Sequence, residues 1–266
     1  MHLFRFSSVG VDAVRSIACE TDVARGETPA GTRVYVVGDI HGQAALLRHM
    51  HEVIVADARD HPIDRRVVVY LGDYIDRGAH TRQVLEMLVS NPLKGFEIVP
   101  LRGNHEAMLL AGLNDDSAFS GWFMNGGRAT AISYGVCDQR QDACWFDAEV
   151  MWTMRQALPE RHLNFIDHTA IAHREGGYVF VHAGLRPGVA LTDQEPEDLV
   201  WIREPFLTTG DDWPFVVVHG HTPVDEPELL RHRINIDTGA FATGRLTCLV
   251  LEGTERRLLT VTGQPH

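Results

Sequence analysis

The sequence has few cysteines, no long apolar run and too few basic residues to balance its acidic ones. Its 24 Lys and Arg stand against 36 Asp and Glu, which gives a formal net charge of −12. This balance argues against broad electrostatic binding to nucleic acid or to an anionic membrane, while leaving room for a local basic pocket. No apolar stretch approaches the length of a membrane span, and the N-terminal segment lacks the continuous apolar core of a secretory signal. We therefore expect a soluble, cytoplasmic protein.

The sequence contains four cysteines, Cys19, Cys137, Cys144 and Cys248. They form no CxxC pair, and their number is too small for a disulfide-stabilised scaffold. We interpret them as reduced structural thiols, with a bridge or a metal site at Cys137 and Cys144 as the alternative.

A chain of 266 residues is long enough for one large domain or two small ones. It has no internal repeat, no low-complexity segment and no convincing linker. We therefore predict a single domain over residues 1–266. Within it, residues 1–33 are expected to form an N-terminal extension. Residues 113–175 have a mostly helical pattern and are expected to form a cap insertion beside the site.

Five β-rich segments share one pattern, because each ends in Asp, Asn or His next to glycine. They are RVYVVGDIHG (33–42), RRVVVYLGDYIDRG (65–78), FEIVPLRGNHE (96–106), GYVFVHAG (177–184) and PFVVVHGHTP (214–223). The segments after the first three carry apolar residues at helical spacing. Alternating strands and helices predict an α/β fold with a parallel sheet, and residues 236–253 predict a final hairpin that returns to it. Since ligands bind at the carboxyl ends of such strands, the polar residues should gather at one rim.

The expected rim combines acidic, amide, imidazole and guanidinium side chains. It contains Asp39, His41, Asp73, Asp76, Arg77, Arg102, Asn104, His105, His182, His219 and His221. Carboxylates packed together repel one another, so the cluster indicates a bound cation. Mixed oxygen and nitrogen ligands without a thiolate suit manganese, iron or zinc. The ligands suffice for two ions bridged by a carboxylate such as Asp73, an arrangement that suits hydrolysis of a phosphate ester.

The order of these motifs resembles the signature of the calcineurin-like metallophosphoesterases. The resemblance rests on GDIHG (38–42), GDYIDRG (72–78), RGNHE (102–106), HAG (182–184) and GHTP (220–223), with NGG (125–127), WIRE (201–204) and IDTGA (236–240). One such motif is weak evidence, whereas five in order are specific. Over most of the chain, about Val34 to Val250, the sequence is most similar to the bacterial and phage branch of the phosphoprotein phosphatases. The resemblance implies the calcineurin-like metallophosphatase fold, a central β-sandwich flanked by helices.

The resemblance also implies roles for individual residues. The matched metal ligands are Asp39, His41, Asp73, Asn104, His182 and His221, with Asp73 as the bridging carboxylate. They imply two divalent metal ions per chain, with Mn²⁺ as the first choice and Fe or Zn²⁺ as alternatives. His105 matches the general acid that protonates the leaving oxygen, and Asp76 matches the carboxylate that orients it. Arg77 and Arg203 match phosphate-binding arginines, and Asn104 also faces the phosphate.

Several residues have alternative interpretations. Arg203 could instead form a salt bridge within WIRE, and Arg102 is a less supported candidate for phosphate binding. His219 precedes the GHTP motif, and we favour a core or supporting role for it over metal binding. His49 and His51 are expected on the surface of a helix.

Three functions are open at this point. The first is a metal-dependent phosphomonoesterase, in particular a serine/threonine protein phosphatase that acts by direct attack of metal-activated water. The second is a hydrolase of dinucleoside polyphosphates, such as diadenosine tetraphosphate, on the same dimetal centre. The third is a non-catalytic phosphate-binding scaffold. Asp76 within DRG and Glu106 within GNHE favour the first over the second, and the presence of every matched residue disfavours the third. The expected partner is a phosphoprotein or a small phosphate ester, and neither nucleic acid nor membrane is expected.

Overall fold

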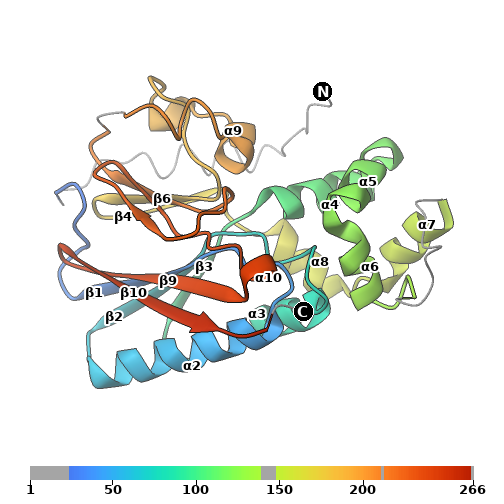
Figure 1. The fold of residues 1–266 in the computed structure, drawn as a ribbon, viewed down its shortest axis with the longest axis horizontal. Helices are drawn as coiled ribbons and strands as arrows, with labels where there is room; N and C mark the ends of the chain where they lie inside the picture. Colours follow the sequence, from blue (N-terminus) through green and yellow to red (C-terminus); the bar gives the residue numbers. More distant parts are fainter. Residues whose placement is uncertain (1–23, 139–147, 211–212, 265–266) are drawn as a thin grey trace.

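Two five-stranded mixed sheets face each other at the centre of the computed structural model, which describes residues 24–138, 148–210 and 213–264 (Figure 1). The first sheet contains, in spatial order, β10 (Glu255–Thr262), β9 (Arg245–Glu252), β1 (Thr32–Val37), β2 (Arg65–Tyr70) and β3 (Glu97–Pro100). The second contains β4 (Ala172–Glu175), β5 (Tyr178–Val181), β6 (Val216–His219), β8 (Arg233–Asn235) and β7 (Glu228–Leu229).

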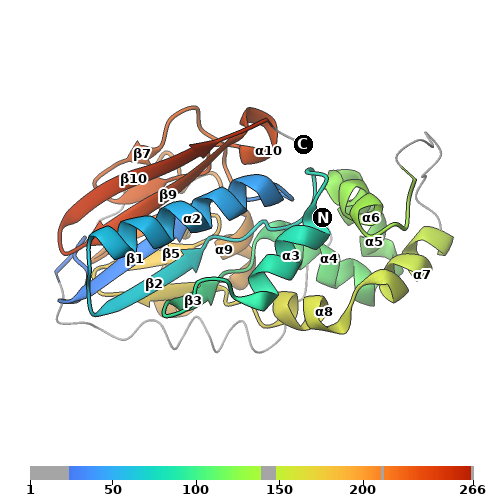
Figure 2. The ribbon, with the colours of Figure 1, turned by 90° about the horizontal axis from the view of Figure 1, so that it is seen from below.

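Helices cover the outer faces of both sheets and gather at one end of the molecule. They are α2 (Ala44–Asp60), α3 (Thr81–Ser90), α4 (Asn104–Asn114), α5 (Asp116–Trp122), the kinked turn η1 (Phe123–Gly127), α6 (Arg128–Ser133), α7 (Ala148–Ala157), α8 (Glu160–Asp167), the 3-10 turn η2 (Leu191–Asp193), α9 (Pro196–Trp201) and α10 (Ala240–Thr243). Figures 1 and 2 show α2 along the first sheet, α9 over the second, and α4 to α8 clustered beside the sandwich.

The alternation of side chains along β1 explains the layers. Val34 and Val36 pack between the two sheets with residues such as Phe180, whereas Tyr35 and Val37 pack against the helices. Successive side chains of a strand point to opposite faces, so a strand buried on both faces reads as a continuous apolar run. This is the reason that the strands were recognisable in the sequence.

The predicted connection of strands and helices is confirmed. Strand β1 pairs in parallel with β2, and β2 pairs in parallel with β3. The predicted hairpin is formed by β9 and β10, and β9 pairs antiparallel with β1. The hairpin therefore makes the first sheet mixed rather than wholly parallel.

The predicted cap, residues 113–175, is mostly helical in the structure. Helices α5 to α8 occupy most of the described part of residues 113–175, while the last four of these residues form β4 of the second sheet. The predicted extension, residues 1–33, overlaps the start of β1 at Thr32, and residues 1–23 lie outside the described part. Cys19 and Cys144 also lie outside it. Cys248 is a buried free thiol as expected, whereas Cys137 is disulfide-bonded, so the prediction of a reduced thiol was wrong there. The division into extension, domain and cap stays a prediction.

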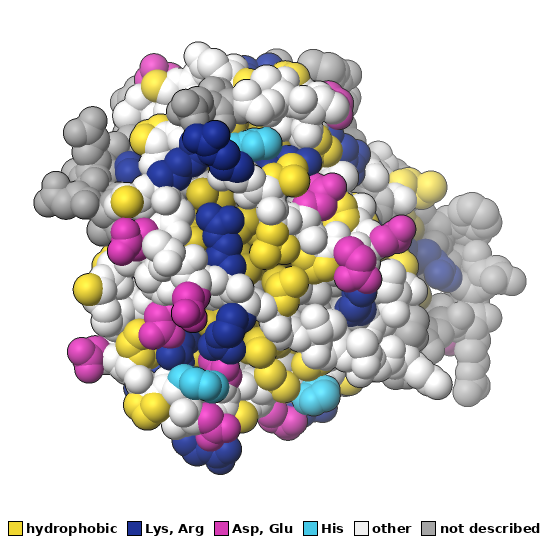
Figure 3. Space-filling view, turned by 60° about the vertical axis from the view of Figure 1, so that its left-hand side comes forward, with side chains coloured by type: hydrophobic (Ala, Val, Ile, Leu, Met, Phe, Trp, Pro, Cys, Tyr) yellow, Lys and Arg dark blue, Asp and Glu magenta, His cyan; other side chains and the backbone are white. Residues whose placement is uncertain are grey.

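The surface shows no large area of one charge on the face in Figure 3, where basic, acidic and apolar side chains are interspersed. The acidic excess of the sequence is therefore not gathered on that face. Among the described helices, none is both long enough and apolar enough to cross a membrane.

Helix α2 buries one histidine that was predicted on its surface. His49 is exposed as expected, but His51 is buried, and its Nε2 lies 2.8 Å from the Tyr70 hydroxyl. The prediction for His51 was wrong because the helix turns this position toward the sheet. Burial lowers the pKa of His51 to about 4.

His51 should therefore make the protein less stable in acid. Its pKa in the folded state lies below the ordinary value of 6.5, so the unfolded chain binds the proton more readily. The contribution of the neutral ring is complete above that ordinary value and is lost as the pH falls toward the folded-state pKa, by roughly 2 kcal/mol at about pH 5. In urea unfolding, His51→Gln should lose less stability than the wild type between about pH 7.5 and about pH 5. Equal losses in the two proteins would contradict a buried neutral imidazole.

Candidate metal and phosphate site

The polar residues at the strand ends converge on one rim, as the sequence predicted. Asp39 follows β1 and Asp73 follows β2, while Asn104 begins α4 just after β3. From the second sheet, His182 follows β5 and His221 follows β6. The two sheets thus contribute ligands to the same place, because the ends of their parallel strands point the same way.

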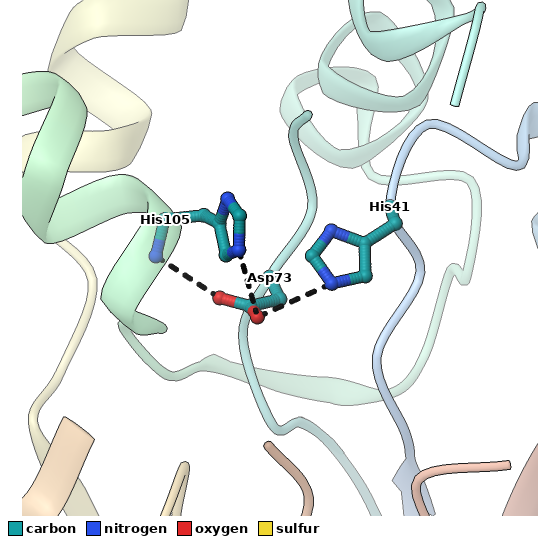
Figure 4. A group of neighbouring side chains, drawn as sticks. All are labelled: His41, Asp73 and His105. Atoms are coloured by element: carbon teal, nitrogen blue, oxygen red, sulfur yellow. Dashed lines mark hydrogen bonds and ion pairs between the residues drawn. The ribbon is translucent and has the colours of Figure 1, made fainter. Parts of the chain in front are cut away.

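Asp73 lies at the centre of this rim. Figure 4 shows its carboxylate between the rings of His41 and His105, whose Nε2 atoms lie 3.3 and 4.0 Å from Asp73 Oδ2. On the other side, His182 Nε2 lies 3.5 Å from Asp73 Oδ1. Two groups could each hold a metal ion, namely His41, Asp73 and His105, and Asp73, His182 and His221. Asp73 belongs to both, which is the position required of a bridging carboxylate.

The buried Glu106 side chain holds Asp73 in place. Its Oε2 accepts hydrogen bonds from the backbone N–H groups of Gly103 and Asp73, both at 2.9 Å, and its Oε1 accepts one from Tyr74 at 2.8 Å. A Cβ atom at Gly103 would overlap the Asp73 carboxylate, so only glycine allows this close approach. The GDYIDRG and RGNHE motifs are thereby locked together.

The backbone of the first of these motifs is strained. Asp73, Asp76 and Arg77 have φ angles of 50°, 69° and 64°, in the left-handed region that side-chain-bearing residues rarely adopt. His41 and His221 share this feature, with φ angles of 44° and 66°. Strain of this kind is concentrated at functional sites, where the surrounding structure maintains it.

The donor atoms fit a divalent cation. His182 Nδ1 faces the Leu71 carbonyl at 2.9 Å and must carry the hydrogen, so the lone pair of Nε2 faces Asn104 Oδ1 at 2.9 Å. Asp39 Oδ1 and His221 Nε2 are buried and have no hydrogen-bond partner in the described structure. Lone pairs that face one another, or that are buried without a donor, are satisfied when a cation lies among them.

The protonation equilibria lead to the same conclusion. Burial and the neighbouring Asp237 and Asp73 carboxylates raise the pKa of Asp39 well above its usual range. Burial also acts to raise the pKa of Asp73, but the surrounding imidazoles, led by that of His182, hold it well below its usual range. Burial lowers the pKa of His221 to about 2, which keeps the ring neutral as metal binding requires. A bound cation would relieve the repulsion between these carboxylates.

His105 is held by a buried carboxylate partner. Its Nδ1 lies 2.7 Å from Asp76 Oδ2, and both side chains are buried. Burial acts to lower the pKa of His105, but the Asp73 and Asp76 carboxylates outweigh it and raise the pKa above its ordinary value. The structure thus groups His105 with His41 and Asp73, whereas the sequence analysis expected Asp39 as their partner in holding the first metal ion. His105 has the geometry of a metal ligand or of an acid oriented by Asp76, and the two roles differ in how many metal ions its substitution removes.

Two exposed arginines flank the metal-binding groups. Arg77 Nη1 donates to His41 Nε2 at 3.0 Å, and its guanidinium carbon lies 4.9 Å from the centre of the Phe241 ring. The charge of Arg203 contributes to the lowered pKa of His221, so Arg203 lies on the side of the second group. Within the described part of the chain, no carboxylate forms an ion pair with Arg203. The salt-bridge alternative for this residue therefore has no support.

Two other residues expected at the rim make contacts elsewhere. Arg102 is buried, its Nε donates to Thr169 Oγ1 at 3.1 Å, and its Nη2 donates to the Asp167 carbonyl at 2.6 Å. These bonds tie the end of α8 to the start of α4, so the phosphate-binding candidate is better described as a structural link. His219 is buried beside Phe206, with ring centres 5.0 Å apart, and belongs to neither of the two groups.

Comparison with known protein families agrees with this geometry. The family model for calcineurin-like phosphoesterases matches residues 32–244, most of the chain. The chain belongs to the calcineurin-like phosphoesterase family. The resemblance read from the motifs is thereby confirmed.

Relatives of this calcineurin-like phosphoesterase differ in the substrates that their names give. Bis(5'-nucleosyl)-tetraphosphatase PrpE (asymmetrical) from Bacillus cereus is 26% identical over 241 residues, which cover 80% of this chain and 88% of the relative. The crystal structure of a provisionally assigned diadenosine tetraphosphatase has a TM-score of 0.64 and 19% identity, covering 90% of this chain and 100% of that one. A protein serine/threonine phosphatase from Saccharomyces cerevisiae has a TM-score of 0.51 and 12% identity, covering 97% and 88%. The solved structures confirm the predicted fold.

The structure of this calcineurin-like phosphoesterase adds residues that sequence reasoning missed. Asp237, Phe241, Trp122 and Thr130 all contact or perturb the rim, the last two through hydrogen bonds to Asp76. Asp237 lies within the IDTGA segment and Phe241 directly follows it. Trp122 and Thr130 lie three residues before and three residues after the NGG segment. Their closeness to the IDTGA and NGG segments, which match the family, was the available signal for them.

Divalent cations should stabilise the protein. Mn²⁺ at about 100 times its Kd would add roughly 2.7 kcal/mol per site. For a domain of this size, that energy raises Tm by roughly 5–10 °C. Thermal unfolding of chelated protein, before and after addition of Mn²⁺, measures the shift.

Asp73→Asn should lose most of this shift, because Asp73 belongs to both groups. Asp60→Asn, on the exposed end of α2, serves as the control and should keep it. A wild-type Tm that does not respond to Mn²⁺, Fe²⁺ or Zn²⁺ would contradict the metal sites.

Proposed function

We propose that this calcineurin-like phosphoesterase hydrolyses phosphate monoesters of alcohols, as a serine/threonine protein phosphatase does. The observation that carries the proposal is the buried His105–Asp76 pair, with 2.7 Å between His105 Nδ1 and Asp76 Oδ2. The alkoxide of serine or threonine is a strong base and a poor leaving group, so it needs a proton in the transition state. An oriented imidazole with a raised pKa is suited to deliver that proton.

The proposal also requires two divalent cations, for which the rim offers candidate ligands. Asp39, His41 and Asp73 would hold one divalent cation, and Asp73, Asn104, His182 and His221 would hold the other. Cations bound there would supply Lewis acidity at the phosphoryl oxygens and a water nucleophile of lowered pKa. The oxygen and nitrogen donors suit Mn²⁺ first, with Fe or Zn²⁺ as alternatives.

The arginines would bind the phosphoryl group. Arg77 approaches from the side of His41 and Arg203 from the side of His221. A planar guanidinium donates two parallel hydrogen bonds to two oxygens of one phosphate. Asn104, between His182 and His221, would face the same group.

A second function is favoured by a different observation. The Bacillus cereus relative, similar over 80% of this chain, is named as an asymmetrical bis(5'-nucleosyl)-tetraphosphatase. Cleavage of such a phosphoanhydride releases a phosphate oxyanion, which is a good leaving group and needs little protonation. The buried acid would then contribute little, and for this reason we rank hydrolysis of a dinucleoside polyphosphate second.

A substrate panel separates the two functions. A phosphoserine or phosphothreonine peptide, an aryl phosphate and a dinucleoside tetraphosphate are compared in the same metal. The proposed function predicts efficient turnover of the phosphopeptide. Efficient turnover of the dinucleoside tetraphosphate alone would establish the second function instead.

Substitution of His105 tests the general acid. His105→Asn should keep both metal ions and slow hydrolysis of phosphoserine by roughly 10²- to 10⁴-fold, the usual contribution of acid–base catalysis. The loss should shrink for an aryl phosphate, because a phenolate leaves with little help. Turnover of both esters and metal content by elemental analysis give the answer. Equal losses for the two esters, or loss of a metal ion, would make His105 a ligand or a structural residue.

Substitution of the arginines tests phosphate binding. Arg77→Ala and Arg203→Ala should each weaken inhibition by phosphate or vanadate, since the lost charged hydrogen bonds are worth roughly 1.5–3 kcal/mol, or about 10- to 150-fold in the inhibition constant. Arg59→Ala, an exposed arginine on α2, is the control and should leave the constant unchanged. Inhibition that is unchanged in a folded Arg203→Ala protein would remove Arg203 from the site.

A further inference from the structure

The Asp76 carboxylate is bound from the helical cluster as well as by His105. Asp76 is fully buried, and Trp122 Nε1 donates to its Oδ2 at 2.9 Å. Thr130 Oγ1 donates to Asp76 Oδ1 at 2.6 Å and accepts the Asp76 backbone N–H at 2.9 Å. With His105, three side chains therefore contact the two carboxylate oxygens.

The segment from Trp122 to Thr130, which carries these donors, packs directly against Asp76 and Arg77. Trp122 ends α5 and Thr130 lies in α6, and between them η1 forms a kink with non-helical backbone at Asn125 and at Gly126, whose φ is 109°. The Gly126 carbonyl accepts the Arg77 backbone N–H at 3.2 Å. A Cβ atom at Gly127 would lie 2.5 Å from the Trp122 ring, so the indole packs directly on the glycine backbone.

Three donors at fixed positions determine the orientation of a carboxylate. A carboxylate bound only by His105 could rotate about its Cβ–Cγ bond and carry the imidazole with it. Trp122 Nε1 donates to both oxygens, at 2.9 Å to Oδ2 and 3.2 Å to Oδ1, and Thr130 also donates to Oδ1, so the plane of the carboxylate is set before the ring binds to it. The direction of His105 Nε2 then follows from the Nδ1 bond, as it does for metal-binding imidazoles that are oriented through their other nitrogen.

We propose that Trp122 and Thr130 are positioning residues that act through Asp76 to aim His105 at the leaving group. Their role rests on the proposed function, because it requires His105 to be the general acid. It gives residues 122–130 a part in the chemical step in addition to any contact with substrate.

Two substitutions test this role, one that nearly keeps the side-chain volume and one that keeps a smaller aromatic ring. Thr130→Val and Trp122→Phe each remove one donor to Asp76. Hydrolysis of phosphoserine should slow by roughly tenfold, the lower end of the effect of removing a partner behind a functional imidazole. Hydrolysis of an aryl phosphate should slow less, and both metal ions should remain bound. Thr130→Ser retains the hydroxyl and should retain the activity.

Matched controls come from nearby and distant positions. Thr81→Val removes a hydroxyl that lies 3.2 Å from Thr130 Oγ1 and has no bond to Asp76. Trp152→Phe changes a tryptophan that is 62% exposed. Both should leave the ratio of alkyl to aryl turnover unchanged.

A double-mutant cycle decides between positioning and mere stabilisation of the fold. In the His105→Asn background, Thr130→Val should add no further loss, because the residue through which it acts is absent. Equal losses for both esters in Thr130→Val, or losses that add fully to those of His105→Asn, would overturn the proposed role while leaving the acid in place. If His105→Asn itself slows both esters equally, the acid fails and the positioning role fails with it. Should Trp122→Phe not fold, the Val and Ser variants of Thr130 complete the test.

Discussion

The Glu106 carboxylate is the contact on which the rest of the site depends. It binds backbone N–H groups on both sides, from Gly103 at the start of α4 and from Asp73 and Tyr74 after β2. This fixes the two segments relative to each other, and the His105 N–H then donates to Asp73 Oδ1 at 3.2 Å. Burial raises the pKa of Glu106 to about 8, and the backbone hydrogen bonds to its two oxygens satisfy this buried group and help to maintain the left-handed backbone of Asp73. A shared metal ligand and a candidate acid are thereby positioned by one side chain.

The second sheet of the sandwich adds its own strand ends to the same rim. The strands and the rim could be predicted from the sequence. Strands buried on both faces leave continuous apolar runs, and polar residues beside glycine mark their ends, so the rim could be predicted from local patterns. Contacts between distant segments could not. Trp122 and Thr130 reach Asp76 across 46 and 54 residues, and nothing near Asp76 in the sequence indicates them. Helical spacing likewise did not show that His51 rather than His49 faces the sheet. Arg102 has the residue type of a phosphate ligand, yet its fixed donors bind backbone and hydroxyl groups of the α8 end.

The site connects two parts of the molecule that the sequence presented as separate. The strand ends supply the candidate metal ligands, and the helical cluster supplies two of the donors that hold Asp76. Asp76 is followed directly by Arg77, which is suited to bind phosphate. The same helical cluster also supports Arg77, because the Gly126 carbonyl accepts its backbone N–H. A change in the α5–α6 segment would therefore alter the proposed proton donor, His105, and the proposed phosphate contact, Arg77, together. This coupling gives a physical reason for a kinked, glycine-rich turn at this point, where a regular helix would not follow the Asp76–Arg77 backbone.

Asp73 as the common ligand of two cations is tested most directly by electron paramagnetic resonance of the Mn²⁺-loaded protein. Two ions bridged by one carboxylate lie roughly 3.5–4 Å apart, close enough for their electron spins to couple. We expect a coupled dimanganese spectrum from the wild type and its loss in Asp73→Asn. A wild-type spectrum of isolated Mn²⁺ ions at full occupancy, or a coupled spectrum that survives in Asp73→Asn, would contradict the shared-carboxylate site.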